Sequence, residues 1–129
     1  VFYLTRSAAQ VMRAQRSGRI INISSVARNG NLGQSNYAAA KAGVAALTQT
    51  AALELGPFGV TCNTVCPGFI DTDMTRGVPD AARERMLSRI PARRSGRPEE
   101  VGDAVAFLAS DRAAYINGQT LDVSGGLIL

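Results

Sequence analysis

Residues 19–24 read RIINIS, and this short run of β-branched side chains decides the fold. Such a run is typical of a strand that is buried in a parallel sheet. The residues that follow, SVARNGNLGQ (25–34), are rich in asparagine and glycine and predict a loop. A long helix is then expected from Ser35, a good N-cap, to Gly56-Pro57, a strong stop. The centre of the chain is thus organised as strand, loop and helix.

The flanking segments continue the alternation of helices and strands. Residues 1–17 carry apolar side chains at helical spacing, with Gly18 as the predicted stop. Downstream the sequence predicts, in order, a strand (59–66), a loop with a single turn (69–79), a short amphipathic helix (80–90), a helix begun by Pro98 (98–110) and a last strand (118–126). The expected fold class is α/β, a doubly wound parallel sheet with helices on both faces. In such sheets, ligands bind beyond the carboxyl ends of the strands.

Composition limits the classes of function. The 129 residues suit one domain that is large enough to bury a core. The net charge of +4 comes from scattered arginines and a local cluster, and few aromatic side chains accompany that cluster. We therefore expect no nucleic-acid partner, and interpret the cluster as a solvated basic face or a dock for an acidic substrate. The cluster consists of Arg89, Arg93, Arg94 and Arg97. No apolar run approaches the roughly 20 residues of a membrane span, so no membrane partner is expected.

Cysteine and histidine usage limits the chemistry further. Cys62 and Cys66 fall on the same face of the predicted strand 59–66, too far apart along one strand to bond to each other. The chain has no histidine and no second cysteine pair, so we expect no metal site and no Ser-His or Cys-His nucleophile. Two small buried thiols indicate a reducing, cytoplasmic setting.

The best candidate for chemistry is the pair Tyr37 and Lys41 in SNYAAAKAG (35–43). Lys41 is the only lysine among 14 basic residues, and it follows Tyr37 by one helical turn. Their Cβ atoms should therefore lie about 6 Å apart on one helix face. A positive charge at that distance favours the phenolate, so such a tyrosine can act as general acid or base. Taken alone the pattern is also common on solvated helix faces, and its setting beside two strand ends favours the functional reading.

Four stretches together resemble the carboxyl-terminal half of a short-chain dehydrogenase/reductase. They are GRIINISS, NYAAAKAG, NTVCPGFIDTDM and AVAFLASDRAAYINGQTLDVSGG, and within that superfamily they look most like the beta-ketoacyl-acyl-carrier-protein reductase type. The resemblance covers essentially residues 1–129 and implies one Rossmann-like domain, of which this chain supplies the last three strands. Strand 19–24 would then lack a neighbour and leave an apolar edge, with poor solubility as a monomer. For the same reason we expect either that residues precede Val1 or that another copy of the chain covers this edge.

The resemblance also implies roles for residues. Tyr37 would donate the proton, Lys41 would favour its ionised form and bind the nicotinamide ribose, and Ser25 would hold the substrate carbonyl oxygen. Tyr37 and Lys41 would therefore also touch the cofactor. Further residues would border the nicotinamide of NADP or NAD: Pro67, Gly68, the Ile70 backbone and Thr72. The glycine-rich turn that grips cofactor phosphates in this family does not occur here.

The spacing of the serine departs from the family pattern. The family separates serine from tyrosine by thirteen residues, whereas Ser25 lies twelve before Tyr37. Ser24 has the family's spacing but faces the opposite side of the strand. We favour Ser25 with a loop shortened by one residue, because strand alternation is harder to shift than loop length.

The expected activity is reduction of a ketone, most simply a 3-oxoacyl thioester presented on an acyl carrier protein. One alternative is an alcohol or sugar dehydrogenase of the same family. Another is a fragment without catalysis that only assembles with partner chains, since the phosphate-binding turn is missing. The small-residue helix at 38–52 and the apolar end at 127–129 predict a homo-oligomer, a dimer or tetramer.

Overall fold

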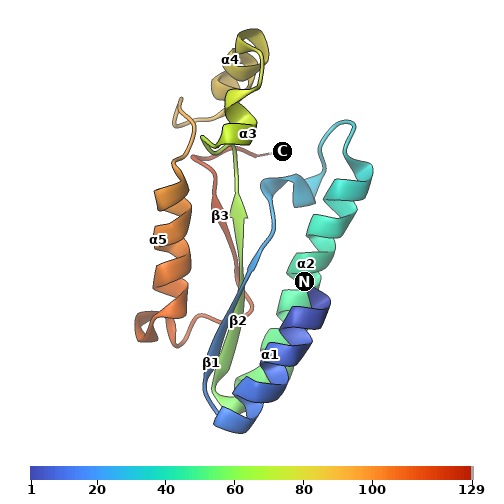
Figure 1. Cartoon of the computed structure of the whole chain (residues 1–129), viewed down its shortest axis with the longest axis vertical. Helices are drawn as coiled ribbons and strands as arrows, with labels where there is room; N and C mark the ends of the chain where they lie inside the picture. Colours follow the sequence, from blue (N-terminus) through green and yellow to red (C-terminus); the bar gives the residue numbers. More distant parts are fainter. Residues whose placement is uncertain (129) are drawn as a thin grey trace.

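The computed structural model describes residues 1–128 and contains one parallel sheet of three strands (Figure 1). The strands β1 (Gly18–Ile23), β2 (Val60–Pro67) and β3 (Thr120–Val123) are paired in the order β1-β2-β3. Ile20 pairs with Cys62, and Val65 pairs with Leu121. The predicted α/β class with a parallel sheet is therefore confirmed.

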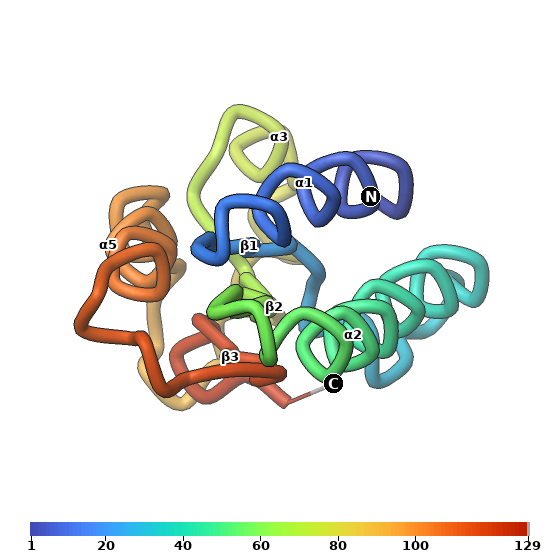
Figure 2. Tube along the Cα trace, turned by 90° about the horizontal axis from the view of Figure 1, so that it is seen from below, coloured from blue at the N-terminus to red at the C-terminus, as the bar shows by residue number. Residues whose placement is uncertain are grey.

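Three long helices cover the two faces of the sheet. The helices α1 (Phe2–Gln15) and α2 (Ser35–Leu55) lie on one face, and α5 (Pro98–Ala109) lies on the other (Figure 2). Short 3₁₀ turns occupy three of the connections: η1 (Val26–Asn29), η2 (Gly56–Phe58) and η3 (Asp111–Ala113). Each parallel crossover is thus made through a helix, as parallel pairing requires.

Side-chain alternation along the strands divides the core into two layers. Ile20 and Cys62 face α1 and α2, where they pack with Ala52 and Leu55. Val65 faces the opposite way and packs with Leu108 of α5. Cys62, Val65 and Cys66 are completely buried, so β2 is the central strand in energetic as well as topological terms.

Two short helices lie beyond the carboxyl ends of the strands, at the top of Figure 1. They are α3 (Asp73–Arg76) and α4 (Asp80–Arg89). Just after α4, Ile90 is buried against Val26 and Leu127, with Met86 and Leu87 packed around them. This small cluster packs the end of α4, η1 and the segment after β3 together near the carboxyl end of the sheet.

Two details of the helix ends differ from the predictions. The first helix ends at Arg16, which adopts a left-handed conformation with φ 54° and donates its backbone N–H to Arg13, so Gly18 is not its stop. Gly18 already belongs to β1, and a Cβ there would collide with the side chain of Met12, so packing accounts for this glycine. Ser35 is the first helical residue of α2 and not its N-cap. Gln34 takes that place because a turn from Asn31 leads directly into the helix.

Two asparagines, the buried Asn63 and the partly buried Asn117, fix the segment that leads into β3. The Asn117 carboxamide accepts a hydrogen bond from the backbone N–H of Cys62 (2.8 Å) and donates one to the carbonyl of Ala52 (3.1 Å). Asn63 donates to the carbonyl of Ile116 at 2.8 Å. Gly118 donates its N–H to the Cys62 carbonyl at 2.9 Å. These bonds replace the regular ladder where β3 has not yet begun.

The outer edge of β1 has no strand partner among the residues that the structure describes. A groove runs beside it, lined by one face of α1 and by the strand itself, including Leu4, Met12 and Ile21. The edge expected from the sequence is therefore present in residues 1–128. Among these same residues, no helix combines the length and the apolar character that crossing a membrane requires.

Candidate functional site

Lys41 and Tyr37 meet at the carboxyl end of β1. The ammonium nitrogen of Lys41 lies 5.6 Å from the centre of the Tyr37 ring, as their spacing on α2 predicts. The same nitrogen donates a hydrogen bond to the carbonyl oxygen of Ile23, the last residue of β1 (3.3 Å). Tyr37 is 42% exposed, and its hydroxyl forms no hydrogen bond within residues 1–128. A partly exposed tyrosine, whose hydroxyl has no hydrogen-bond partner among these residues, thus lies beside a cation.

The two serines after β1 have different surroundings. The Ser24 side chain is buried, and its hydroxyl donates to the carbonyl oxygen of Lys41 at 2.7 Å. The Ser25 hydroxyl oxygen accepts a hydrogen bond from the N–H of Ala27 at 3.1 Å, which caps η1. A serine hydroxyl in this position retains its own proton for donation. Ser24 is therefore committed to the helix that carries Lys41, while Ser25 keeps a free donor.

The segment after β2 lies at the same edge of the sheet. Gly68 donates its N–H to Val123 at 3.0 Å, and a Cβ on Gly68 would lie only 2.8 Å from the Cα of Ser124. The Thr75 hydroxyl donates to the Ile70 carbonyl at 2.7 Å, and it accepts from the N–H of Thr72 at 2.8 Å. The segment that carries Pro67, Gly68, Ile70 and Thr72 is held in one shape by these contacts.

The remaining carboxylates of this edge belong to ion pairs. Asp71 and Asp73 both accept from Arg76, at 3.2 and 3.0 Å. Within the described part of the chain, no cluster of three potential metal ligands occurs.

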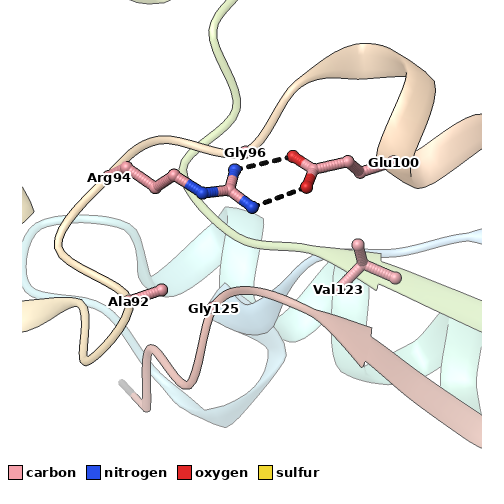
Figure 3. A pocket seen from close by; sticks show the side chains of 6 residues that line it. All are labelled: Ala92, Arg94, Gly96, Glu100, Val123 and Gly125. Atoms are coloured by element: carbon pink, nitrogen blue, oxygen red, sulfur yellow. Dashed lines mark hydrogen bonds and ion pairs between the residues drawn. The ribbon is translucent and has the colours of Figure 1, made fainter.

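A second ion pair fixes the connection between α4 and α5 (Figure 3). Arg94 donates two hydrogen bonds to Glu100, at 2.6 and 2.8 Å, and Glu100 also accepts from the backbone N–H of Arg97 at 2.7 Å. These hydrogen bonds, with Arg94 as the larger cause, lower the pKa of Glu100 from 4.5 to about 2. The pocket beside them has a volume of about 80 Å³, which is small for a cofactor site. The role of Arg94 shown by the structure is therefore to close a turn.

Sequence reasoning missed one ion pair near the candidate site. Arg28 of η1 donates two hydrogen bonds to Asp122 of β3, at 2.6 and 3.2 Å. The two residues are 94 positions apart, and no local pattern signals their contact. Arg28 lies close to the buried thiol of Cys66. Burial raises the pKa of this thiol, and the positive charge of Arg28 partly offsets the rise. The hydrogen bonds that Arg28 donates to the Asp122 carboxylate raise the pKa of Arg28.

The donors left over at this edge suit an oxygen-rich ligand. The Lys41 ammonium makes one hydrogen bond within residues 1–128, although it can donate three. The backbone N–H of Ile70 has no acceptor among these residues. A ribose and a carboxamide offer the oxygen acceptors that such donors need. The residues present therefore fit the nicotinamide end of a dinucleotide.

These features define a class of protein, an α/β unit with its ligand-binding groups at the carboxyl edge of a parallel sheet. A family model described as enoyl-(acyl carrier protein) reductase matches residues 1–128, and the chain belongs to this family of short-chain dehydrogenases/reductases. The resemblance stated from the sequence is confirmed.

Individual relatives extend the comparison. The chain is 52% identical to the 3-oxoacyl-(acyl-carrier-protein) reductase FabG of Vibrio cholerae over 130 residues, which cover 100% of the chain and 53% of that protein. The FabG of Escherichia coli is 50% identical over the same shares of both proteins. The (3R)-3-hydroxyacyl-CoA dehydrogenase of Rattus norvegicus is 51% identical over 99% of the chain and 50% of its own length. The chain thus spans about half the length of the curated relatives it matches.

Proposed function

We propose that this chain carries the chemical half of an NAD(P)-dependent reductase that converts a 3-oxoacyl thioester to the 3-hydroxyacyl thioester. The observation that carries the proposal is the placement of the Lys41 ammonium beside the half-exposed Tyr37, 5.6 Å from the centre of its ring. Two FabG relatives at 50% identity or more, named as 3-oxoacyl-(acyl-carrier-protein) reductases, support the substrate class. We also propose that residues 1–129 form the carboxyl-terminal half of a single domain.

In this proposal the proton comes from Tyr37. A reduced nicotinamide held by Lys41 and the segment after β2 would supply the hydride for the carbonyl carbon. Tyr37 gives the hydroxyl proton to the oxygen on which negative charge develops, and Lys41 stabilises the resulting phenolate through its positive charge. The Lys41 ammonium is held for this task by the Ile23 carbonyl. The reaction then needs no histidine, in keeping with a chain that has none.

Ser25 is the proposed holder of the substrate carbonyl oxygen. Its oxygen already accepts from Ala27, so its proton remains available for the substrate. The Ser24 proton is directed to Lys41 within a buried contact. This difference supports Ser25 over Ser24, as strand alternation does. The spacing of twelve residues between Ser25 and Tyr37 fits a loop shortened by one residue.

The cofactor end of the proposed site is formed by two elements. Lys41 and Tyr37 of α2 would face the ribose, and the segment after β2 would border the nicotinamide and its carboxamide. In that segment the free N–H of Ile70 is the donor that suits the carboxamide oxygen. The other residues assigned to this end are Pro67, Gly68 and Thr72. We propose NADP or NAD as the cofactor without distinguishing the two.

A second candidate is the reverse reaction on a related thioester. The relative from Rattus norvegicus is named as a (3R)-3-hydroxyacyl-CoA dehydrogenase and is 51% identical, which supports this second candidate. In that direction Tyr37 would accept the proton as a phenolate. An alcohol or sugar dehydrogenase, and a non-catalytic fragment, are the further alternatives.

We further propose that the protein is a cytoplasmic homo-oligomer and that it takes its acyl chain from an acyl carrier protein.

The deciding experiment replaces Tyr37 by phenylalanine in the natural full-length protein. Turnover of a 3-oxoacyl thioester is followed by the loss of reduced nicotinamide absorbance. Tyr37→Phe should lower kcat by about 10²- to 10⁴-fold, because it removes only the proton donor. Tyr115→Phe is the matched control, since Tyr115 is fully exposed on a different loop. Full activity of Tyr37→Phe would overturn the proposed mechanism, and so would an equal loss in both variants.

A further inference from the structure

The Arg28–Asp122 ion pair is the best-formed contact between the loop after β1 and the far strand of the sheet. The two terminal guanidinium nitrogens of Arg28 donate hydrogen bonds to the two carboxylate oxygens of Asp122, at 2.6 and 3.2 Å. The Arg28 side chain is 17% exposed and that of Asp122 is 38% exposed. A two-point contact of this kind fixes orientation as well as distance.

The pair spans the carboxyl end of the sheet. Asp122 lies on β3 opposite Cys66 of β2, and Arg28 reaches it from the turn that follows β1. The guanidinium therefore crosses the central strand, close to the buried thiol of Cys66. One side chain thus connects the loop after the first strand to the third strand of the sheet.

The same turn determines where the Ser25 hydroxyl points. Ser25 caps η1, and its oxygen accepts from the N–H of Ala27, while its carbonyl accepts from the N–H of Arg28 at 3.1 Å. Val26 is buried against Ile90 and Leu127, and this packing holds one side of the turn. The other side leads to Gly30, with φ 106°, and to the fully exposed Leu32. On that outer side, Arg28 provides the anchor.

We propose that the Arg28–Asp122 ion pair holds the η1 turn in place and thereby positions the Ser25 hydroxyl for the substrate carbonyl. Arg28 and Asp122 are positioning residues that act through Ser25 and touch neither substrate nor cofactor. This inference rests on the proposed function. It also gives the shortened loop between Ser25 and Tyr37 a physical support, because a contact across the sheet holds the turn that presents Ser25.

The test uses Arg28→Met and Asp122→Asn in the natural full-length protein, with Arg28→Lys as the conservative variant. Each single variant should lower kcat about tenfold, because displacing a positioning group such as the Ser25 hydroxyl by about 1 Å has effects of this size or larger. The KM for the reduced nicotinamide should stay within about twofold, since the proposed role of Ser25 is toward the substrate carbonyl. The double variant should lose no more kcat than either single variant, as expected for two residues that act as one unit. Arg28→Lys keeps the charge and should recover part of the rate.

Arg19→Met is the matched control. Arg19 also pairs with an aspartate, Asp111 at 3.3 Å, and its side chain is 18% exposed, but it lies at the opposite end of β1. Hydrogen exchange of the peptide that covers residues 24–34 gives a readout without turnover. This peptide should exchange faster in Arg28→Met and remain unchanged in Arg19→Met, because of the two arginines only Arg28 belongs to this turn.

The outcomes separate the two proposals. Wild-type turnover that depends on Tyr37 supports the proposed function, and a wild-type protein without such turnover removes it together with this inference. Given that turnover, the inference is overturned if Arg28→Met keeps kcat within twofold of Arg19→Met. It is equally overturned if the losses of Arg28→Met and Asp122→Asn multiply in the double variant. Faster exchange at residues 24–34 with a selective loss of kcat supports it.

Discussion

Replacing Gly68 by alanine tests the tight approach between the segment after β2 and the end of β3. A Cβ on Gly68 would lie 2.8 Å from both the Cα and the Cβ of Ser124. Carbon atoms in good contact are about 3.5 Å or more apart, so the overlap is about 0.7 Å. Because Ser124 Cα is backbone, no side-chain rotation relieves it. The hydrogen bond from Gly68 to Val123 opposes a shift of either segment.

Two effects should follow from this overlap. Overpacking of this kind costs about 1–3 kcal/mol of folding free energy, so urea unfolding followed by circular dichroism should show a lower midpoint at unchanged slope. If the segment moves instead, Ile70 and Thr72 move with it. The affinity for reduced nicotinamide dinucleotide, measured by fluorescence titration, should then fall about tenfold or more.

Gly77→Ala is the control for this experiment. Gly77 has φ −78°, a conformation open to alanine, and the nearest atom to its added Cβ is 3.8 Å away, an ordinary contact. The reasoning is refuted if Gly68→Ala matches Gly77→Ala in both unfolding free energy and cofactor affinity. A loss in stability alone would mean that the protein absorbs the overlap away from the cofactor edge.

Two further predictions concern pH. The Arg94 and Arg97 contacts lower the pKa of Glu100 from 4.5 to about 2, so their stabilising contribution is complete above pH 4.5 and is lost as the pH falls toward 2. The free energy of unfolding should therefore depend less on pH in this window in Glu100→Gln, and an unchanged slope would contradict the assignment. Burial raises the pKa of the Cys62 thiol from 9.0 to about 11, so the unfolded chain ionises first and stability should fall between these pH values. Cys62→Ala should flatten that fall in urea unfolding, and an equally steep fall in the variant would show that other groups cause it.

The fold followed from local patterns, because they record which faces are buried. The β-branched residues 19–24 form β1, and the small-residue helix that begins at Ser35 forms α2, as expected. Tyr37 and Lys41 lie together because four residues make about one helical turn, which the chain fixes without tertiary contacts. The amphipathic helix expected at 80–90 also forms, as α4, and Met86, Leu87 and Ile90 pack in one cluster.

The parts that sequence reasoning missed depend on contacts between distant segments. Gly18 was expected to end the first helix, but its small size serves close packing with Met12. The bond from Ser24 to the Lys41 carbonyl depends on how α2 lies against β1, which no local pattern reports. The Arg28–Asp122 pair depends on strand order and register in the same way. A long-range contact between charged residues leaves no periodic signature in the chain.

The hydrogen bonds around Asn117 bear on the chemical ageing of this protein. Asparagine is a thermolabile residue, and an asparagine followed by glycine loses its side-chain amide when the next backbone nitrogen attacks it. In the folded chain the Gly118 nitrogen is engaged by the Cys62 carbonyl, and both ends of the Asn117 carboxamide are bonded. Deamidation there requires local opening of the segment before β3. Once formed, the new carboxylate would face the Ala52 carbonyl without a proton to offer it, so this damage would keep the segment open and mark molecules that had once opened.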